Sequence, residues 1–126
     1  MQPNSEFLTP DECIEVDKAL LTSKDKFSAR IAIYALRSLK QIAQKSGQAI
    51  ADLHPTQIED WIYQDKSLQG GIDNEFKKFF SQLVIASINP LTQIAQANQT
   101  NIESLTISQV VSWFEVKAKE ALKSQR

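Results

Sequence analysis

The stretch LKQIAQ at residues 39–44 recurs as LTQIAQ at residues 91–96. The same offset of 52 residues aligns residues 26–62 with 78–114 without a gap, and 12 of the 37 aligned positions are identical, a tryptophan among them. Two amphipathic helices of equal period would match at apolar positions, but they would not share a Gln-Ile-Ala-Gln run or a tryptophan in register. The sequence therefore predicts two tandem copies of one structural unit.

Three of the expected helices begin with the same signal. Leu-Thr-Pro-Asp-Glu at 8–12, Leu-His-Pro-Thr-Gln at 53–57 and Leu-Thr-Ile-Ser-Gln at 105–109 each place a Glu or Gln three residues after a capping position. Glycines at 47 and 70–71 are typical stops for the helices that precede them. These signals predict five helices, at residues 10–21, 23–46, 55–65, 73–97 and 106–123.

We expect an all-α fold, because 3 Gly and 4 Pro are too few to punctuate a sheet of short strands. Each predicted unit is a long helix, a polar loop and a short helix, and one such unit cannot enclose its own apolar face. The two helix–loop–helix repeats, 26–62 and 78–114, are therefore expected to pack as a pseudo-twofold bundle. Residues 1–126 then form a single domain, divided into an N-terminal covering helix (1–22), repeat unit 1 (23–65) and repeat unit 2 (72–123).

The helical period also predicts the core. At 100° per residue, one apolar stripe follows each long helix, and the second is thickened by two further phenylalanines. The predicted core residues of the long helices are Phe27, Ile31, Ala35, Leu39, Ile42, Phe76, Phe79, Phe80, Leu83, Leu91 and Ile94. Trp61 and Trp113 are in register between the repeats, so we expect both to pack inside the protein.

Composition excludes several classes of protein. The chain has 14 basic and 15 acidic residues, so it has no overall charge that would favour nucleic acid or a membrane surface. No apolar run approaches the roughly 18 residues that a membrane helix needs, and the first residues lack the pattern of a secretory signal. Cys13 is the only cysteine, so no intrachain disulfide can form. A cytoplasmic protein is expected.

No pattern of catalytic or metal-binding residues is found. The lone histidine, His54, occupies a helix-capping position, and Cys13 has the spacing of a hydrophobic staple. There is no phosphate-binding glycine loop, nucleophile elbow or metal-ligand spacing. We therefore expect no catalytic residue, no metal and no cofactor, and a protein that is not an enzyme.

One surface feature differs between the two copies. Lys26, Arg30, Arg37 and Lys40 lie within an arc of about 80° on the first long helix, and uncharged residues replace three of them in the second copy. We call these four residues the basic stripe, and they are the candidate partner-binding residues. A solvated helix face is the alternative interpretation.

Residues 29–62 resemble the helical core-binding domain of tyrosine recombinases. The residues that carry the resemblance are Tyr34, Leu39, Ile42, Leu53, Ile58 and Trp61. In that family the domain grips DNA and a catalytic domain follows, whereas here only the second copy follows. The run FLTP at 7–10 and the glutamine-rich helix around LKQIAQ also resemble small cyanobacterial proteins of unassigned activity.

The leading hypothesis is a non-catalytic helical module for protein–protein interaction, an adaptor or assembly factor with a protein partner or a homodimer contact. The second hypothesis is a helical domain that binds nucleic acid through the basic stripe, weakly, because no aromatic residue among the cations would stack on bases. The third is a small enzyme or ligand binder with a pocket between the two units. An exposed apolar patch would favour the first, a continuous positive surface the second and a deep polar pocket the third.

Overall fold

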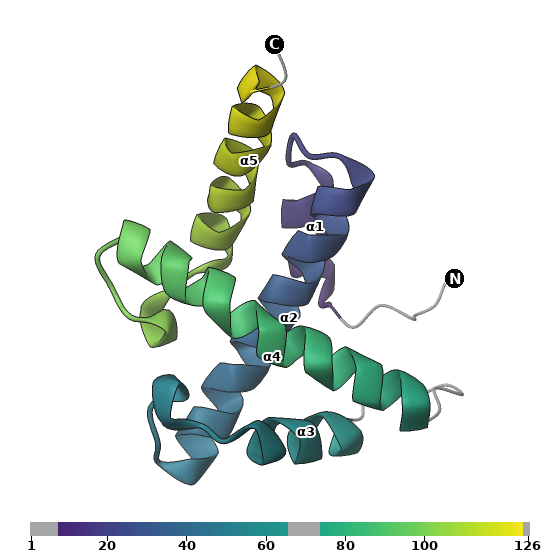
Figure 1. Ribbon diagram of the computed structural model, residues 1–126, viewed down its shortest axis with the longest axis vertical. Helices are drawn as coiled ribbons and strands as arrows, with labels where there is room; N and C mark the ends of the chain where they lie inside the picture. Colours follow the sequence, from purple (N-terminus) through teal and green to yellow (C-terminus); the bar gives the residue numbers. More distant parts are fainter. Residues whose placement is uncertain (1–7, 66–73, 125–126) are drawn as a thin grey trace.

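The computed structural model describes residues 8–65 and 74–124, and this part of the chain is helical without any strand (Figure 1). The prediction of an all-α protein with five helices is confirmed. The five helices are α1 (Pro10–Asp17), α2 (Ser23–Ser46), α3 (Pro55–Gln64), α4 (Asn74–Ala97) and α5 (Ile107–Ser124).

The helix starts are those that the capping signals predict. Thr9 caps α1 through its hydroxyl, which accepts from the Glu12 N–H, while the Glu12 carboxylate accepts from the Thr9 N–H at 2.9 Å. Thr106 and Gln109 exchange the same two hydrogen bonds at the start of α5. These reciprocal bonds satisfy backbone donors that a helix leaves unpaired at its first turn.

Helix α1 ends earlier than predicted, at Asp17 rather than at residue 21. After Asp17 the chain turns so that Ala19 is buried, and the N–H of Leu20 donates to the Glu115 carboxylate of α5 at 3.0 Å. A continued helix would point Leu20 in another direction and forfeit this long-range bond. A tertiary contact therefore overrides the local helical preference here.

The loops of the two units have the same local structure. A residue with positive φ follows each long helix, Gly47 at 72° directly after α2 and Gln99 at 56° shortly after α4, and these two residues are equivalent in the alignment. A short 3-10 helix follows in each unit, η1 (Ile50–Asp52) and η3 (Ile102–Ser104), where the sequence predicts only a polar loop. The shared geometry is what a duplication predicts, and common ancestry of the two units stays a prediction.

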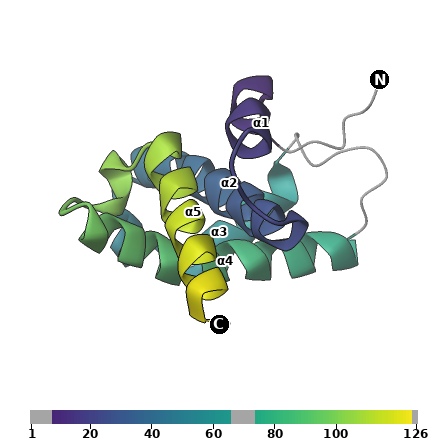
Figure 2. The ribbon, with the colours of Figure 1, turned by 90° about the horizontal axis from the view of Figure 1, so that it is seen from above.

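The two units interlock. Helices α2 and α4 cross near the centre of the molecule (Figure 1), and each short helix packs chiefly on the long helix of the other unit: α3 on α4, and α5 on α2. Helix α1 lies against both α2 and α5 (Figure 2). Neither unit encloses its own apolar face, as the amphipathic pattern had indicated.

The core forms where these helices meet. Its largest fully buried side chains include Tyr34, Leu39, Ile58, Phe80 and Leu91.

Three predicted core residues lie outside the core, which corrects the prediction. Phe27 is 49% exposed, Phe76 is 43% exposed and Phe79 is 55% exposed. Each lies on a side of its helix that no other helix covers, although the same turns are packed elsewhere: Phe80 is 2% exposed, and Lys26 binds the C-terminal end of α1. Helical periodicity identifies the direction in which a side chain points, but not whether another element covers it.

Candidate partner-binding surface

Lys26 and Arg30, the first two residues of the basic stripe, bind the C-terminal end of α1. Arg30 forms an ion pair of 3.1 Å with Asp17, and the Lys26 ammonium donates to the Asp17 backbone carbonyl at 3.1 Å. A cation is favourable at this place because the carbonyls at a helix C-terminus carry partial negative charge. Both side chains are partly buried and face α1.

Arg37 binds Glu12 in the first turn of α1. Its guanidinium donates from Nε and from a terminal nitrogen to the two Glu12 carboxylate oxygens, at 3.1 and 3.2 Å. The Glu12 side chain is only 7% exposed and also closes the capping box with Thr9. One buried carboxylate therefore joins the start of α1 to the middle of α2.

The fourth cation joins the two repeat units. The Lys40 ammonium donates to the Leu105 carbonyl, just before α5, at 2.8 Å. Arg37 and Lys40 line a hollow of about 500 Å³ between α1, α2 and the start of α5. The charged groups in this hollow are already engaged with one another or with the backbone. The basic stripe therefore faces neighbouring helices, and its role in binding a partner stays a prediction.

Tyr34 is a buried polar residue for which the sequence gives no signal beyond the resemblance to tyrosine recombinases. Its hydroxyl donates to the Asp65 carboxylate at the end of α3, and its ring packs against Phe80 at 5.1 Å and beneath the Arg37 guanidinium. Burial, reinforced by the neighbouring Asp65 carboxylate, raises the pKa of Tyr34 above its ordinary value. The residue has a structural role, since it connects α2, α3 and α4.

Within residues 8–65 and 74–124, the most apolar hollow lies where α2, α4 and α5 meet. Its volume is about 390 Å³, and we call it the apolar groove. The residues that line it are Phe27, Ser28, Ile31 and Ala32 of α2, Leu83, Ala86, Ser87 and Pro90 of α4, and Trp113 and Phe114 of α5. None of these side chains is ionisable, so the groove offers apolar contact and no catalytic acid or base.

The two tryptophans are each partly buried and packed against the core. Trp61 lies under the Lys45 ammonium, 5.9 Å from the ring centre, and Trp113 lies under the Lys117 ammonium at 5.3 Å. Trp113 also packs edge-on against Phe114 in the wall of the apolar groove. Both indoles pack against the core but are only partly buried, which corrects the expectation that they lie inside the protein.

The remaining candidates for chemistry are dispersed. His54 is exposed before α3, where its backbone N–H donates to the Gln57 side-chain oxygen, and Cys13 is partly buried against the core. Across residues 8–65 and 74–124, no three His, Cys, Asp or Glu side chains gather as metal ligands would. The same residues contain no helix that is both long enough and apolar enough to cross a membrane.

Comparison with known proteins identifies the family. Residues 8–121, which include α1 to α4 and most of α5, match the family model described as NDH complex assembly factor CRR9. Neither a curated protein nor a solved structure matches the chain. The family is one of assembly factors, which agrees with the prediction of a non-catalytic adaptor or assembly factor. The chain belongs to the family of the NDH complex assembly factor CRR9.

Proposed function

We propose that this protein assists the assembly of an NDH complex by binding one of its subunits, and that it catalyses no reaction. The observation that carries the proposal is the family match over residues 8–121, which spans both repeat units and the covering helix. The apolar groove supports it, because exposed apolar hollows mark sites of protein–protein contact.

The charge distribution is consistent with a protein partner. All four cations of the basic stripe contact other parts of this chain, and the most apolar hollow described carries no ionisable group. Protein interfaces have cores depleted in charged residues and enriched in aromatic ones, as this groove is. The cytoplasmic location expected from the sequence stays a prediction.

Deletion of the gene tests the proposal. We expect the deletion strain to accumulate less NDH complex on native gels, and a plasmid copy of the gene to restore it. We also expect the chain to co-purify with unassembled subunits and to be missing from the finished complex, which separates an assembly factor from a structural subunit. Normal accumulation of the complex in the deletion strain would refute the proposal.

A further inference from the structure

The apolar groove continues along α4 beyond its lining residues. Phe76 and Phe79 are exposed, and they lie on the same face of α4 as Leu83, Ala86 and Pro90, at spacings of three and four residues. From the first to the last of these five residues, the face runs about 21 Å along the helix. The apolar surface is therefore longer than the hollow itself.

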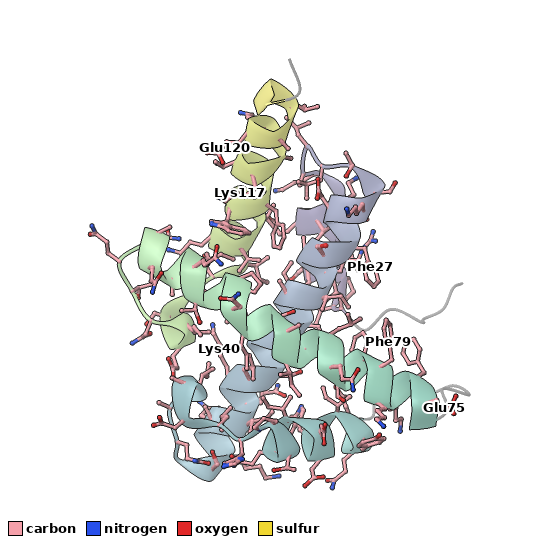
Figure 3. The ribbon with its side chains drawn as sticks, in the orientation of Figure 1. Phe27, Lys40, Glu75, Phe79, Lys117 and Glu120 are labelled. Atoms are coloured by element: carbon pink, nitrogen blue, oxygen red, sulfur yellow. The ribbon has the colours of Figure 1, made fainter. Side chains whose placement is uncertain are left out.

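The other two helices supply the walls. Phe27 of α2 lines the groove while remaining 49% exposed, and Trp113 and Phe114 of α5 close its opposite side. Figure 3 shows Phe27 and Phe79 on the same edge of the molecule, contributed by α2 and α4, with Lys117 of α5 further away. We call the apolar groove together with Phe76 and Phe79 the trough. Helix α4 forms its base, and aromatic residues of α2 and α5 line its sides.

The polar groups in the trough are few and uncharged. The polar side-chain groups of its lining are the hydroxyls of Ser28 and Ser87 and the indole N–H of Trp113, and the Ser87 hydroxyl already donates to the Leu83 carbonyl at 2.9 Å. A charged side chain placed here would lose its hydration without gaining a partner. The trough therefore selects an occupant with an uncharged, apolar contact face.

The length of this face fits a helix. About 21 Å accommodates roughly four helical turns, and helices pack by placing the side-chain ridge of one into the groove of another.

We propose that the trough of α2, α4 and α5 binds an apolar helix of an unassembled NDH-complex subunit, a helix that the finished complex buries. This inference rests on the proposed function and adds the binding surface and the kind of segment that it accepts. Such an occupant needs temporary cover because its apolar face would otherwise be exposed to water and prone to self-association.

The first test locates the occupant by photo-crosslinking in cells that make the NDH complex. A benzoylphenylalanine is placed at residue 79 and, as a control, at residue 14, because Ile14 is 58% exposed on α1 and outside the trough. We expect residue 79, but not residue 14, to cross-link to the apolar face of a helix in an NDH subunit. A cross-link to a second copy of this chain, to a polar loop or to no NDH subunit would overturn the inference.

The second test measures affinity with a synthetic peptide of the cross-linked helix. In a Trp61→Phe background, Trp113 reports occupancy, since exclusion of water shifts indole emission to the blue. We expect the double substitution Phe27→Ser/Phe79→Ser to weaken binding at least tenfold, and Ile14→Ser to leave it unchanged. Because all three side chains are largely exposed, these variants are expected to fold. Equal binding by both variants would overturn the inference.

A complementation assay separates this inference from the proposed function. If the gene with Phe27→Ser/Phe79→Ser restores the NDH complex as fully as wild type, the trough is not the binding surface, although the assembly role stands. If the deletion itself leaves the complex unchanged, the assembly role fails first.

Discussion

Two arginines on α2 both pair with α1, yet their surroundings differ. Arg37 binds Glu12, whose side chain is 7% exposed, whereas Arg30 binds Asp17, whose side chain is 63% exposed. Water screens the second pair far better than the first. The stripe that looks uniform in the sequence therefore contains one structural ion pair and one peripheral ion pair.

We expect Arg37→Met to lower the free energy of unfolding by about 2–3 kcal/mol, because it leaves the buried Glu12 carboxylate without its cation. Arg30→Met, the matched control, should cost less than about 1 kcal/mol. Urea denaturation followed by circular dichroism measures both. Equal losses for the two variants would contradict the difference in burial.

Tyr34 predicts a dependence of stability on alkaline pH. Its pKa is raised in the folded protein by burial and by Asp65, so below the ordinary tyrosine pKa of about 10 both folded and unfolded states keep the proton. Above that pH the unfolded chain releases the proton and the folded protein does not, so stability falls as pH rises further.

We expect Tyr34→Phe to lose about 1 kcal/mol at neutral pH, through the hydrogen bond to Asp65, and to show a shallower decline of stability above about pH 10. Chemical denaturation at a series of alkaline pH values, compared with wild type, makes the measurement. An unchanged alkaline slope would show that Tyr34 does not contribute to it.

At the scale of the elements, the clearest correspondence between the repeats is the residue of positive φ that follows each long helix. Gly47 and Gln99 both have positive φ, a conformation that glycine adopts freely and that strains most other residues. No other atom lies within 4 Å of the place where a Cβ on Gly47 would be, so only backbone strain opposes a side chain there.

We expect Gly47→Ala to destabilise the protein by about 1 kcal/mol, and Gln99→Gly to stabilise it by roughly 0.5 kcal/mol. Gln96→Gly is the control, because glycine inside a helix costs about 1 kcal/mol. Thermal and urea unfolding of the three variants would decide the matter. A loss of stability in Gln99→Gly would contradict the equivalence of the two helix ends.

Some helix boundaries could be predicted from the sequence and others could not. Capping residues and glycines are local signals, so the helix starts and the end of α2 were predictable to within a residue or so. The early end of α1 was not, because it depends on Glu115, which is distant in sequence. The exposure of Phe27 and Phe79 depends on whether a neighbouring helix covers their side of α2 or α4, and this property belongs to the arrangement in space.

At the scale of the whole molecule, the sequence predicts some residues of the candidate site but not their contacts. The basic stripe could be predicted as a set of residues on one helix face, but not its contacts with Asp17, Glu12 and the Leu105 carbonyl. The apolar groove combines three helices from both repeat units, so no single stretch of sequence carries a signal for it. Only the interlocking of the units brings its walls together.

The same arrangement yields a prediction about nucleic acid. Because the basic stripe is engaged with α1 and with the start of α5, we expect no tight binding of duplex DNA or single-stranded RNA at physiological salt. A salt titration by fluorescence anisotropy, with Lys26→Gln/Arg30→Gln as the comparison, makes the measurement. Tight binding with a slope of about −3 to −4 in log K against log salt, abolished by the double substitution, would instead support four phosphate contacts.

Hydrogen bonds between the two repeat units have a consequence for synthesis on the ribosome. The N–H of Ile50 donates to the Glu103 carboxylate at 2.7 Å, and Lys40 reaches the Leu105 carbonyl. The first half of the chain therefore lacks these partners, and the α5 covering of α2, until the second half has left the exit tunnel. Until then the nascent first unit is an incomplete amphipathic surface, so it cannot complete its tertiary structure on its own.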